Sequence, residues 1–172
     1  KTKIGLLPLY LELYDQMLSD RRAGMQAFYN TVADGLRRQG LDVVTAPVCR
    51  LATEFKAAIA GFEKSGVDAL VPLHLAYSPS LESAAALAAT RLPIIVLDTT
   101  PDYEFSPRQE PDRIMYNHGI HGVQDMCNRL LRNGKPFVIE AGHWQKSDVL
   151  KRVARRVVSA RIVRKVGFGL DE

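Results

Sequence analysis

The chain alternates short apolar runs with longer runs of helical period, and this alternation constrains its fold more than any other feature. The clearest apolar run is Pro93–Leu97 (PIIVL), which contains no polar position. A strand that is apolar throughout is typical of a parallel sheet that helices cover on both faces. The pattern therefore predicts an α/β protein rather than an all-helical or all-β protein.

Five strands and five helices follow from this pattern. The strands are expected at Lys3–Leu9, Asp42–Thr45, Val67–Leu73, Pro93–Leu97 and Pro136–Ala141, and the helices at Arg21–Gln39, Thr53–Ser65, Ser80–Arg91, Gly119–Arg132 and Ser147–Lys165. Strictly alternating strands and helices, joined by right-handed crossovers, leave few topologies. We predict a doubly wound, five-stranded parallel sheet in the flavodoxin-like order 2-1-3-4-5, with helices on both faces.

Length and composition fit one α/β domain over residues 1–172. With 47% hydrophobic and 24% charged residues, the chain is not expected to be mainly disordered. No apolar run approaches the length of a membrane span, and no basic-then-apolar secretory signal is present. Cys49 and Cys127 are too few for a disulfide framework, so we expect reduced thiols and a cytoplasmic protein.

The positive charge is concentrated at one end of the chain. Residues 1–145 carry 15 Lys and Arg against 16 Asp and Glu, whereas residues 146–172 carry 8 against 3. Nucleic-acid-binding proteins more often spread basic residues over a face with interleaved aromatic residues. We therefore expect a solvated basic face on the last helix, and neither nucleic acid nor membrane as a partner. The residues expected to face outward are Lys151, Arg152, Arg155 and Arg156.

All four histidines follow the carboxyl ends of expected strands. His74 follows the third strand, and His143 follows the fifth. His118 and His121 come after the fourth strand and the long connection 98–117. Ligands of open α/β sheets bind at this edge. Because imidazole donates, accepts or ligates, the sequence predicts a polar pocket there for hydroxyl groups or a metal.

The segment Asn117–Gly122 (NHGIHG) is the sharpest local signal. His118 and His121 are three residues apart and share a face if a helix has begun. The two glycines permit close approach of a ligand, and the helix N-terminus offers free N–H groups. A metal held by the two histidines would need a third ligand from elsewhere.

Each of these residues also has a structural interpretation. For the Asn117–Gly122 segment this alternative is a structural turn, although a ligand role is the favoured interpretation. His74 would be a core histidine with its hydrogen bonds satisfied, and His143 would hold a turn. Tyr10 after the first strand and Tyr77 after the third would pack at the rim. Both interpretations remain open from the sequence.

Several enzyme classes lack their motifs here. No Gly-x-Gly-x-x-Gly follows the first strand, no Walker loop is present, and no Gly-x-Ser-x-Gly elbow occurs. Asp98 and Glu140 are the main carboxylates at the expected strand ends, and they do not make an evident acid–base pair. The motifs therefore favour ligand binding over catalysis by this chain alone.

Four short segments resemble the N-terminal domain of the L-arabinose/L-fucose isomerase family, closest to L-arabinose isomerase-like proteins. They are Ile4–Tyr10 (IGLLPLY), His74–Ser80 (HLAYSPS), Asn117–Asn128 (NHGIHGVQDMCN) and Gly142–Gln145 (GHWQ). Each follows or ends an expected strand, and the likeness runs from about Lys3 to Lys165. The tail Gly167–Glu172 matches nothing in the family.

This resemblance implies the N-terminal, substrate-lining and assembly domain of a longer three-domain enzyme. Such an enzyme interconverts aldoses and ketoses through an enediol, with Mn²⁺ held by domains outside this chain. The chain would then contribute no catalytic or metal-binding residue. In the homo-oligomer it would line the sugar pocket of a neighbouring subunit. The residues implied to line the sugar are Leu9, Tyr10, Tyr77, His118 and His121.

Two other functions remain open from the sequence. The chain could be a stand-alone sugar-binding or regulatory module of the same fold without catalysis. It could also be an assembly domain whose basic last helix docks against the rest of an enzyme or against a partner.

Overall fold

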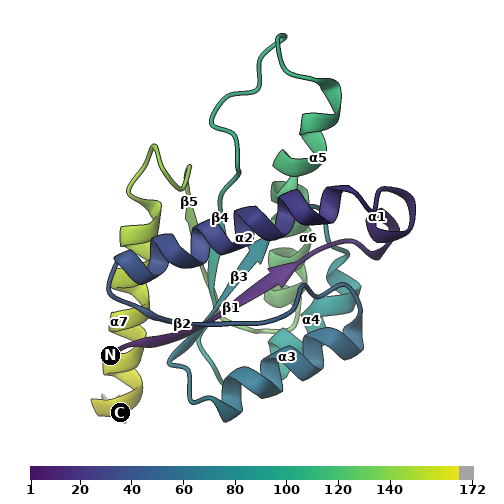
Figure 1. Ribbon diagram of the computed structural model, residues 1–172. Coiled ribbons are helices and arrows are strands. Elements are labelled where there is room, and N and C mark those ends of the chain that lie inside the picture. Colours follow the sequence, from purple (N-terminus) through teal and green to yellow (C-terminus); the bar gives the residue numbers. More distant parts are fainter. Residues whose placement is uncertain (167–172) are drawn as a thin grey trace.

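The computed structural model describes residues 1–166, and its centre is a five-stranded, all-parallel sheet (Figure 1). The strands are β1 (Lys3–Leu9), β2 (Asp42–Thr45), β3 (Ala69–His74), β4 (Ile95–Asp98) and β5 (Val138–Ala141). Their order is β2-β1-β3-β4-β5, which confirms the predicted topology. Strands β3, β4 and β5 each begin two residues later than the sequence predicted, and β3 and β4 each extend one residue further, to His74 and Asp98.

Helices cover both faces of the sheet, as predicted. On one face, α2 (Arg21–Arg38) and α7 (Val149–Val166) pack on inward side chains such as Leu6 and Val71. On the other face, α3 (Ala52–Lys64) and α6 (Gly119–Arg132) pack on side chains that include Leu70 and Val96, beside α4 (Ser80–Ala89). Burial on both faces explains why these strands carry no alternating polar residues.

The register brings the carboxyl ends of the strands to one level. Leu9, the last residue of β1, pairs with His74, the last residue of β3. Asp98 at the end of β4 pairs with Ala141 at the end of β5. The segments that follow all five strands therefore emerge along a single edge, which we call the carboxyl edge.

Three short helices at this edge were not predicted. They are α1 (Glu12–Met17), the 3₁₀ helix η1 (Pro111–Arg113) and α5 (Ile114–Asn117). None of them contains a buried residue, so none carries the apolar stripe from which sequence reasoning recognises a helix. Helices this short are formed by their tertiary contacts rather than by their own propensity.

The long connection between β4 and α6 stands out from the body of the molecule (Figure 1). Its base is closed by Asp102, whose carboxylate accepts two hydrogen bonds from the Arg113 guanidinium, at 2.9 and 2.8 Å. Asn117 donates to the same carboxylate at 2.7 Å and accepts from the Asp102 backbone N–H at 3.0 Å. Asn117 thus has a structural role at the base of the loop.

Two basic residues of α7 bind a carboxylate. Arg152 is only partly exposed, contrary to the prediction, whereas Arg156 is exposed as predicted. Arg152 and Arg156 donate to the buried carboxylate of Glu140, at 2.7 and 2.8 Å. These two hydrogen bonds lower the pKa of Glu140. Further along α7, Arg164 donates to the carbonyls of Val67 and Asp68 beyond the end of α3. Some arginines of α7 therefore form hydrogen bonds to a carboxylate or to backbone carbonyls of the fold, whereas Arg155 is exposed as predicted.

Two further expectations can be compared with the structure. Cys49 and Cys127 are both buried and form no disulfide, as expected, and burial raises their thiol pKa values to about 12 and about 11. Among the helices within residues 1–166, none combines the length and the apolar character that crossing a bilayer requires.

Gly5 in β1 is required by close packing against α3, which yields a stability prediction. A Cβ at this position would lie 2.5 Å from the ring of Phe62, a side chain that is itself fully buried. Gly5→Ala should therefore lower the free energy of unfolding by about 1–3 kcal/mol through overpacking. Urea denaturation followed by circular dichroism measures the change.

Gly61 in α3 provides the matched control, because a Cβ there meets no atom within 4 Å. Gly61→Ala should raise the free energy of unfolding by about 0.5–1 kcal/mol, the difference in helix propensity. Equal effects of the two substitutions would contradict this account of the packing.

Candidate functional site

Aromatic and imidazole rings form a continuous row along the carboxyl edge. Tyr10 follows β1 directly, and its ring packs edge-on against Tyr14 of α1, with 6.1 Å between ring centroids. Tyr14 lies 5.9 Å from His118, and their Oη and Nε2 atoms are 3.2 Å apart, within hydrogen-bond distance. His118 lies 6.4 Å from His121 on the first turn of α6. We call these four residues the ring row.

The row continues along the same face of α6 to Asp125, four residues after His121. The Asp125 carboxylate accepts a hydrogen bond from the Ser80 backbone N–H at 3.0 Å, and the Tyr77 hydroxyl lies 3.5 Å from it. Asp125 therefore fixes the start of α4 and the position of Tyr77. Tyr77 thus lies beside Asp125 of α6, about one helical turn after His121.

The buried side chain of His74 packs directly against the first turn of α6. A Cβ on Gly122 would lie 2.4 Å from His74 Cδ2 and 2.8 Å from Nε2. A Cβ on Gly119 would lie 2.9 Å from the His74 carbonyl oxygen. The two glycines of the Asn117–Gly122 segment therefore let α6 begin directly against the end of β3, and their role in the packing is established.

Several buried polar atoms at this edge have no hydrogen-bond partner within residues 1–166. They are Tyr10 Oη, both ring nitrogens of His74, Ser78 Oγ and His118 Nδ1. Leaving a buried donor or acceptor unpaired costs about 1–3 kcal/mol. Buried polar groups are rarely left unpaired in this way, so a local group of them calls for an explanation such as a bound ligand or water.

Tyr10, His118 and the neighbouring His74 are electrically neutral near pH 7, and their pKa shifts favour this state. Burial, and secondly the nearby Asp15 carboxylate, raise the pKa of Tyr10 to about 12. Burial, and secondly His121, lower the pKa of His118. Burial lowers the pKa of His74 to about 3. Each side chain can therefore donate or accept a hydrogen bond without carrying charge.

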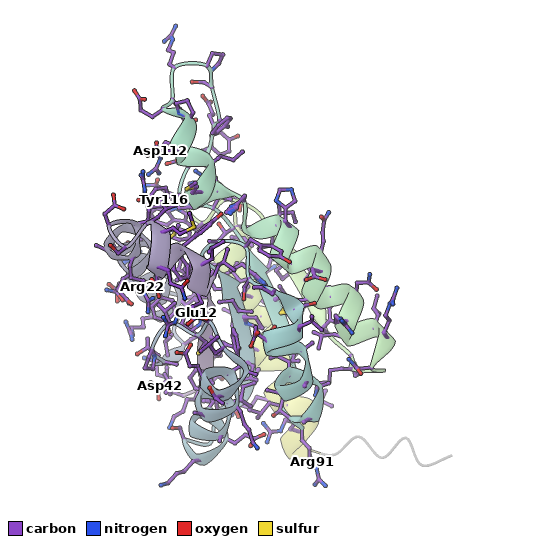
Figure 2. All side chains as sticks on the ribbon, turned by 90° about the vertical axis from the view of Figure 1, so that its right-hand side faces the viewer. Glu12, Arg22, Asp42, Arg91, Asp112 and Tyr116 are labelled. Atoms are coloured by element: carbon purple, nitrogen blue, oxygen red, sulfur yellow. The ribbon has the colours of Figure 1, made fainter. Side chains whose placement is uncertain are left out.

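Charged residues surround the row in pairs. Arg22 lies over the Tyr10 ring, 5.3 Å from its centroid, and forms an ion pair with Asp15 of α1. Arg21 pairs with Asp112 of η1 and lies 5.9 Å from the ring centroid of Tyr116. In Figure 2, Asp112 and Tyr116 lie toward the end with the long connection, Arg22 and Glu12 lie below them, and Asp42 and Arg91 lie toward the other end.

His143 and Leu9 have structural surroundings. His143 Nδ1 accepts from the backbone N–H groups of Gln145 and Lys146, at 3.2 and 3.1 Å, so Nε2 carries the proton and donates to the Pro101 carbonyl at 3.2 Å. His143 thus holds its turn, the structural alternative considered above. Leu9 is fully buried in the core on the α3 and α6 side of the sheet.

The structure allows a check of metal-binding geometry. Over the part of the chain that is described, no three His, Cys, Asp or Glu side chains come together as a metal site would require. Asp98, at the end of β4, is partly buried, and this burial raises the pKa of its carboxyl. Glu140 is held by its two arginines.

Sequence reasoning found Tyr10, Tyr77, His118 and His121 but missed the residues that join them. Tyr14 occupies a helix that the apolar pattern does not reveal, and Asp125 is one polar residue among several on α6. The spacing could have revealed Asp125, which follows His121 by four residues on α6. It could not have revealed Tyr14, because Tyr10 precedes α1.

No protein-family model and no curated protein sequence matches the chain. Among solved structures, the chain is similar to the transcriptional repressor AscG of Escherichia coli, with a TM-score of 0.37 and 14% sequence identity. The alignment covers 94% of this chain, and the chain spans 65% of the repressor chain.

These findings correct the resemblance to the L-arabinose/L-fucose isomerase family, which is wrong. The four segments that suggested it are short, and the structure gives several of their residues other roles. Asn117 closes the base of a loop, and His143 holds a turn. Gly119 and Gly122 leave the space that His74 occupies. The isomerase activity, Mn²⁺ in further domains and a homo-oligomer were implied by that resemblance alone, and they stay untested predictions.

The buried, neutral state of His74 leads to a pH prediction. Between its ordinary pKa of 6.5 and about 3, the unfolded chain binds a proton at His74 that the folded protein excludes. The wild-type protein should therefore lose stability as the pH falls through this range, by about 1.4 kcal/mol per pH unit more than His74→Gln, which has no proton to bind. Urea unfolding of both proteins at a series of pH values measures the difference. Parallel losses in the two proteins would contradict the assignment.

Proposed function

We propose that this chain is a binding domain for a polyhydroxylated small molecule, a sugar being the leading class, and that the ring row holds the ligand. The observation that carries the proposal is Tyr10 Oη, which is buried at the end of β1 without a partner among the described residues. The carboxyl edge of a doubly wound sheet is also where such folds bind their ligands.

The chemistry of the row favours hydroxyl groups as ligand partners. Tyr10, Tyr14 and His118 offer neutral groups that donate or accept, and a hydroxyl of the ligand can do either. Tyr10 Oη and His118 Nδ1 both have an unmet hydrogen bond, and Tyr14 contacts both rings. Two ligand hydroxyls could therefore each satisfy one of these atoms.

The charges near the row do not favour an anionic ligand. Arg22 is paired with Asp15, Arg21 with Asp112, and Arg113 with Asp102. A ligand with a phosphate or carboxylate would be repelled by these carboxylates, although Arg21 Nε has no hydrogen-bond partner among the described residues. Neutral polyols meet no such repulsion.

Tyr10→Phe tests the proposal through two opposite effects. If the hydroxyl serves only a ligand, its removal should leave the free energy of unfolding of the ligand-free protein unchanged or raise it by up to about 1 kcal/mol, because an unpaired buried group is removed. The same substitution should weaken sugar binding by about 3- to 10-fold, the loss of one hydrogen bond. Thermal unfolding with and without individual aldopentoses and aldohexoses measures both effects.

The design needs a matched control, because sugars at high concentration stabilise proteins in general by exclusion from the surface. Tyr103→Phe supplies it, since Tyr103 is exposed and packs against His143, outside the ring row. A sugar-dependent rise in Tm that survives in Tyr103→Phe and shrinks in Tyr10→Phe supports the proposal. A rise of the same size in all three proteins, or no rise with any sugar, overturns it.

A further inference from the structure

The short helix α1 is attached to the rest of the molecule by few contacts. It has six residues, none of them buried, and its Leu13 and Met17 side chains are 49% and 71% exposed. A segment with so little apolar burial belongs to the least stable part of a fold, where local opening costs little free energy. Figure 1 shows α1 at the periphery of the molecule, between the end of β1 and the start of α2.

Asp15 is the side chain of α1 that forms ion pairs with residues outside this helix. Its carboxylate pairs with Arg22 of α2 and accepts from Arg50 Nη1 at 2.9 Å. Arg50 is also held by Glu54 of α3, with 2.7 Å between Arg50 Nη2 and Glu54 Oε1. Arg50 therefore keeps a partner in the body whether or not Asp15 is present. Asp15 is the only one of the four that lies on α1.

Two of the residues with unmet hydrogen bonds, Tyr10 and His118, contact a side chain of this helix. Tyr14 of α1 packs against Tyr10 on one side and against His118 on the other, at ring-centroid distances of 6.1 and 5.9 Å. Its hydroxyl also lies 3.2 Å from His118 Nε2. A ligand that bonds to His118 Nε2 must therefore displace the Tyr14 hydroxyl, and one that stacks on the Tyr10 ring from this side must displace the Tyr14 ring.

We infer that α1 is a movable cover over the ring row, held shut by the contact of Asp15 with Arg22 and Arg50. This inference rests on the proposed function, because it describes how a ligand would enter that same site. When α1 moves away, Tyr14 leaves with it, and the Tyr10 ring and His118 Nε2 lose the side chain that covers them. Because α1 buries none of its residues, its local opening costs little free energy and a ligand can hold it open.

Diethyl pyrocarbonate tests the cover without knowledge of the ligand, since it modifies accessible neutral imidazoles. The rate at each histidine is read by peptide mass spectrometry. His121 is exposed and serves as the internal reference, and His74 is buried and serves as the negative control. Asp15→Asn should raise the rate at His118 relative to His121 by about 3- to 10-fold, the effect of losing weak ion pairs.

Asp34→Asn is the matched control, because Asp34 forms an exposed ion pair with Arg37 on the distant half of α2. It should leave the His118 rate unchanged. A second measurement uses the wild-type protein alone: added NaCl screens the Asp15 contact and should raise the His118 rate. An unchanged rate at His118 in both Asp15→Asn and high salt overturns the inference. An increase at His74 as large as at His118 also overturns it, because it indicates general loosening.

The outcomes separate this inference from the proposed function. Faster His118 labelling in Asp15→Asn, without sugar binding by any variant, would support the inference that α1 is a cover and would refute the ligand class. Sugar binding that depends on Tyr10, with His118 labelling insensitive to Asp15, would support the function and refute the cover.

Discussion

Strands β1 and β3 pair in parallel from Ile4 opposite Ala69 to Leu9 opposite His74, and both are buried on their two faces. Parallel strands require a crossover for each connection, so helices must cover both faces of the sheet. Every helix that returns to the sheet then starts at the carboxyl edge. This one constraint brings Tyr10, His74 and the N-terminus of α6 into the same small region, although they are distant in sequence.

The carboxyl edge contains two kinds of buried polar group. Glu140 is fully paired, with Arg152 and Arg156 donating to its two oxygens, and serves the stability of the fold. Tyr10 Oη and the His74 nitrogens are unpaired among the residues described. Several unpaired groups at about 1–3 kcal/mol each are a large cost for a domain whose net stability is about 5–15 kcal/mol. Proteins generally tolerate such costs where a function requires them.

The fold could be predicted from the sequence because its signals are local and repeated. Apolar runs such as Pro93–Leu97, and glycines with positive φ such as Gly40 after α2, mark strands and helix ends directly. The site was predicted only in part, because the edge position of a histidine follows from topology but its partners do not. The sequence could not show that His143 is bonded to its own turn while His118 contacts α1. Nor could it show that α1 exists, because a six-residue helix without buried side chains has no apolar period.

The family resemblance was wrong for a related physical reason. Glycine, histidine and tyrosine at strand ends meet demands that the α/β architecture makes in many unrelated proteins. Gly122 illustrates this, because the His74 ring leaves no room for a Cβ at that position. Short segments of this kind therefore indicate an edge that can hold a ligand, and they do not identify the ligand or the family.

The central claim is that the carboxyl edge binds a neutral polyol at the ring row, and amide NMR of the wild-type protein tests it most directly. The backbone ¹H–¹⁵N resonances would be followed while single aldopentoses and aldohexoses are added. The account predicts saturable shifts confined to α1, to Tyr10 and to residues 118–122. Shifts that are absent for every sugar, or that centre on the opposite edge around Lys3 and Arg91, would contradict it.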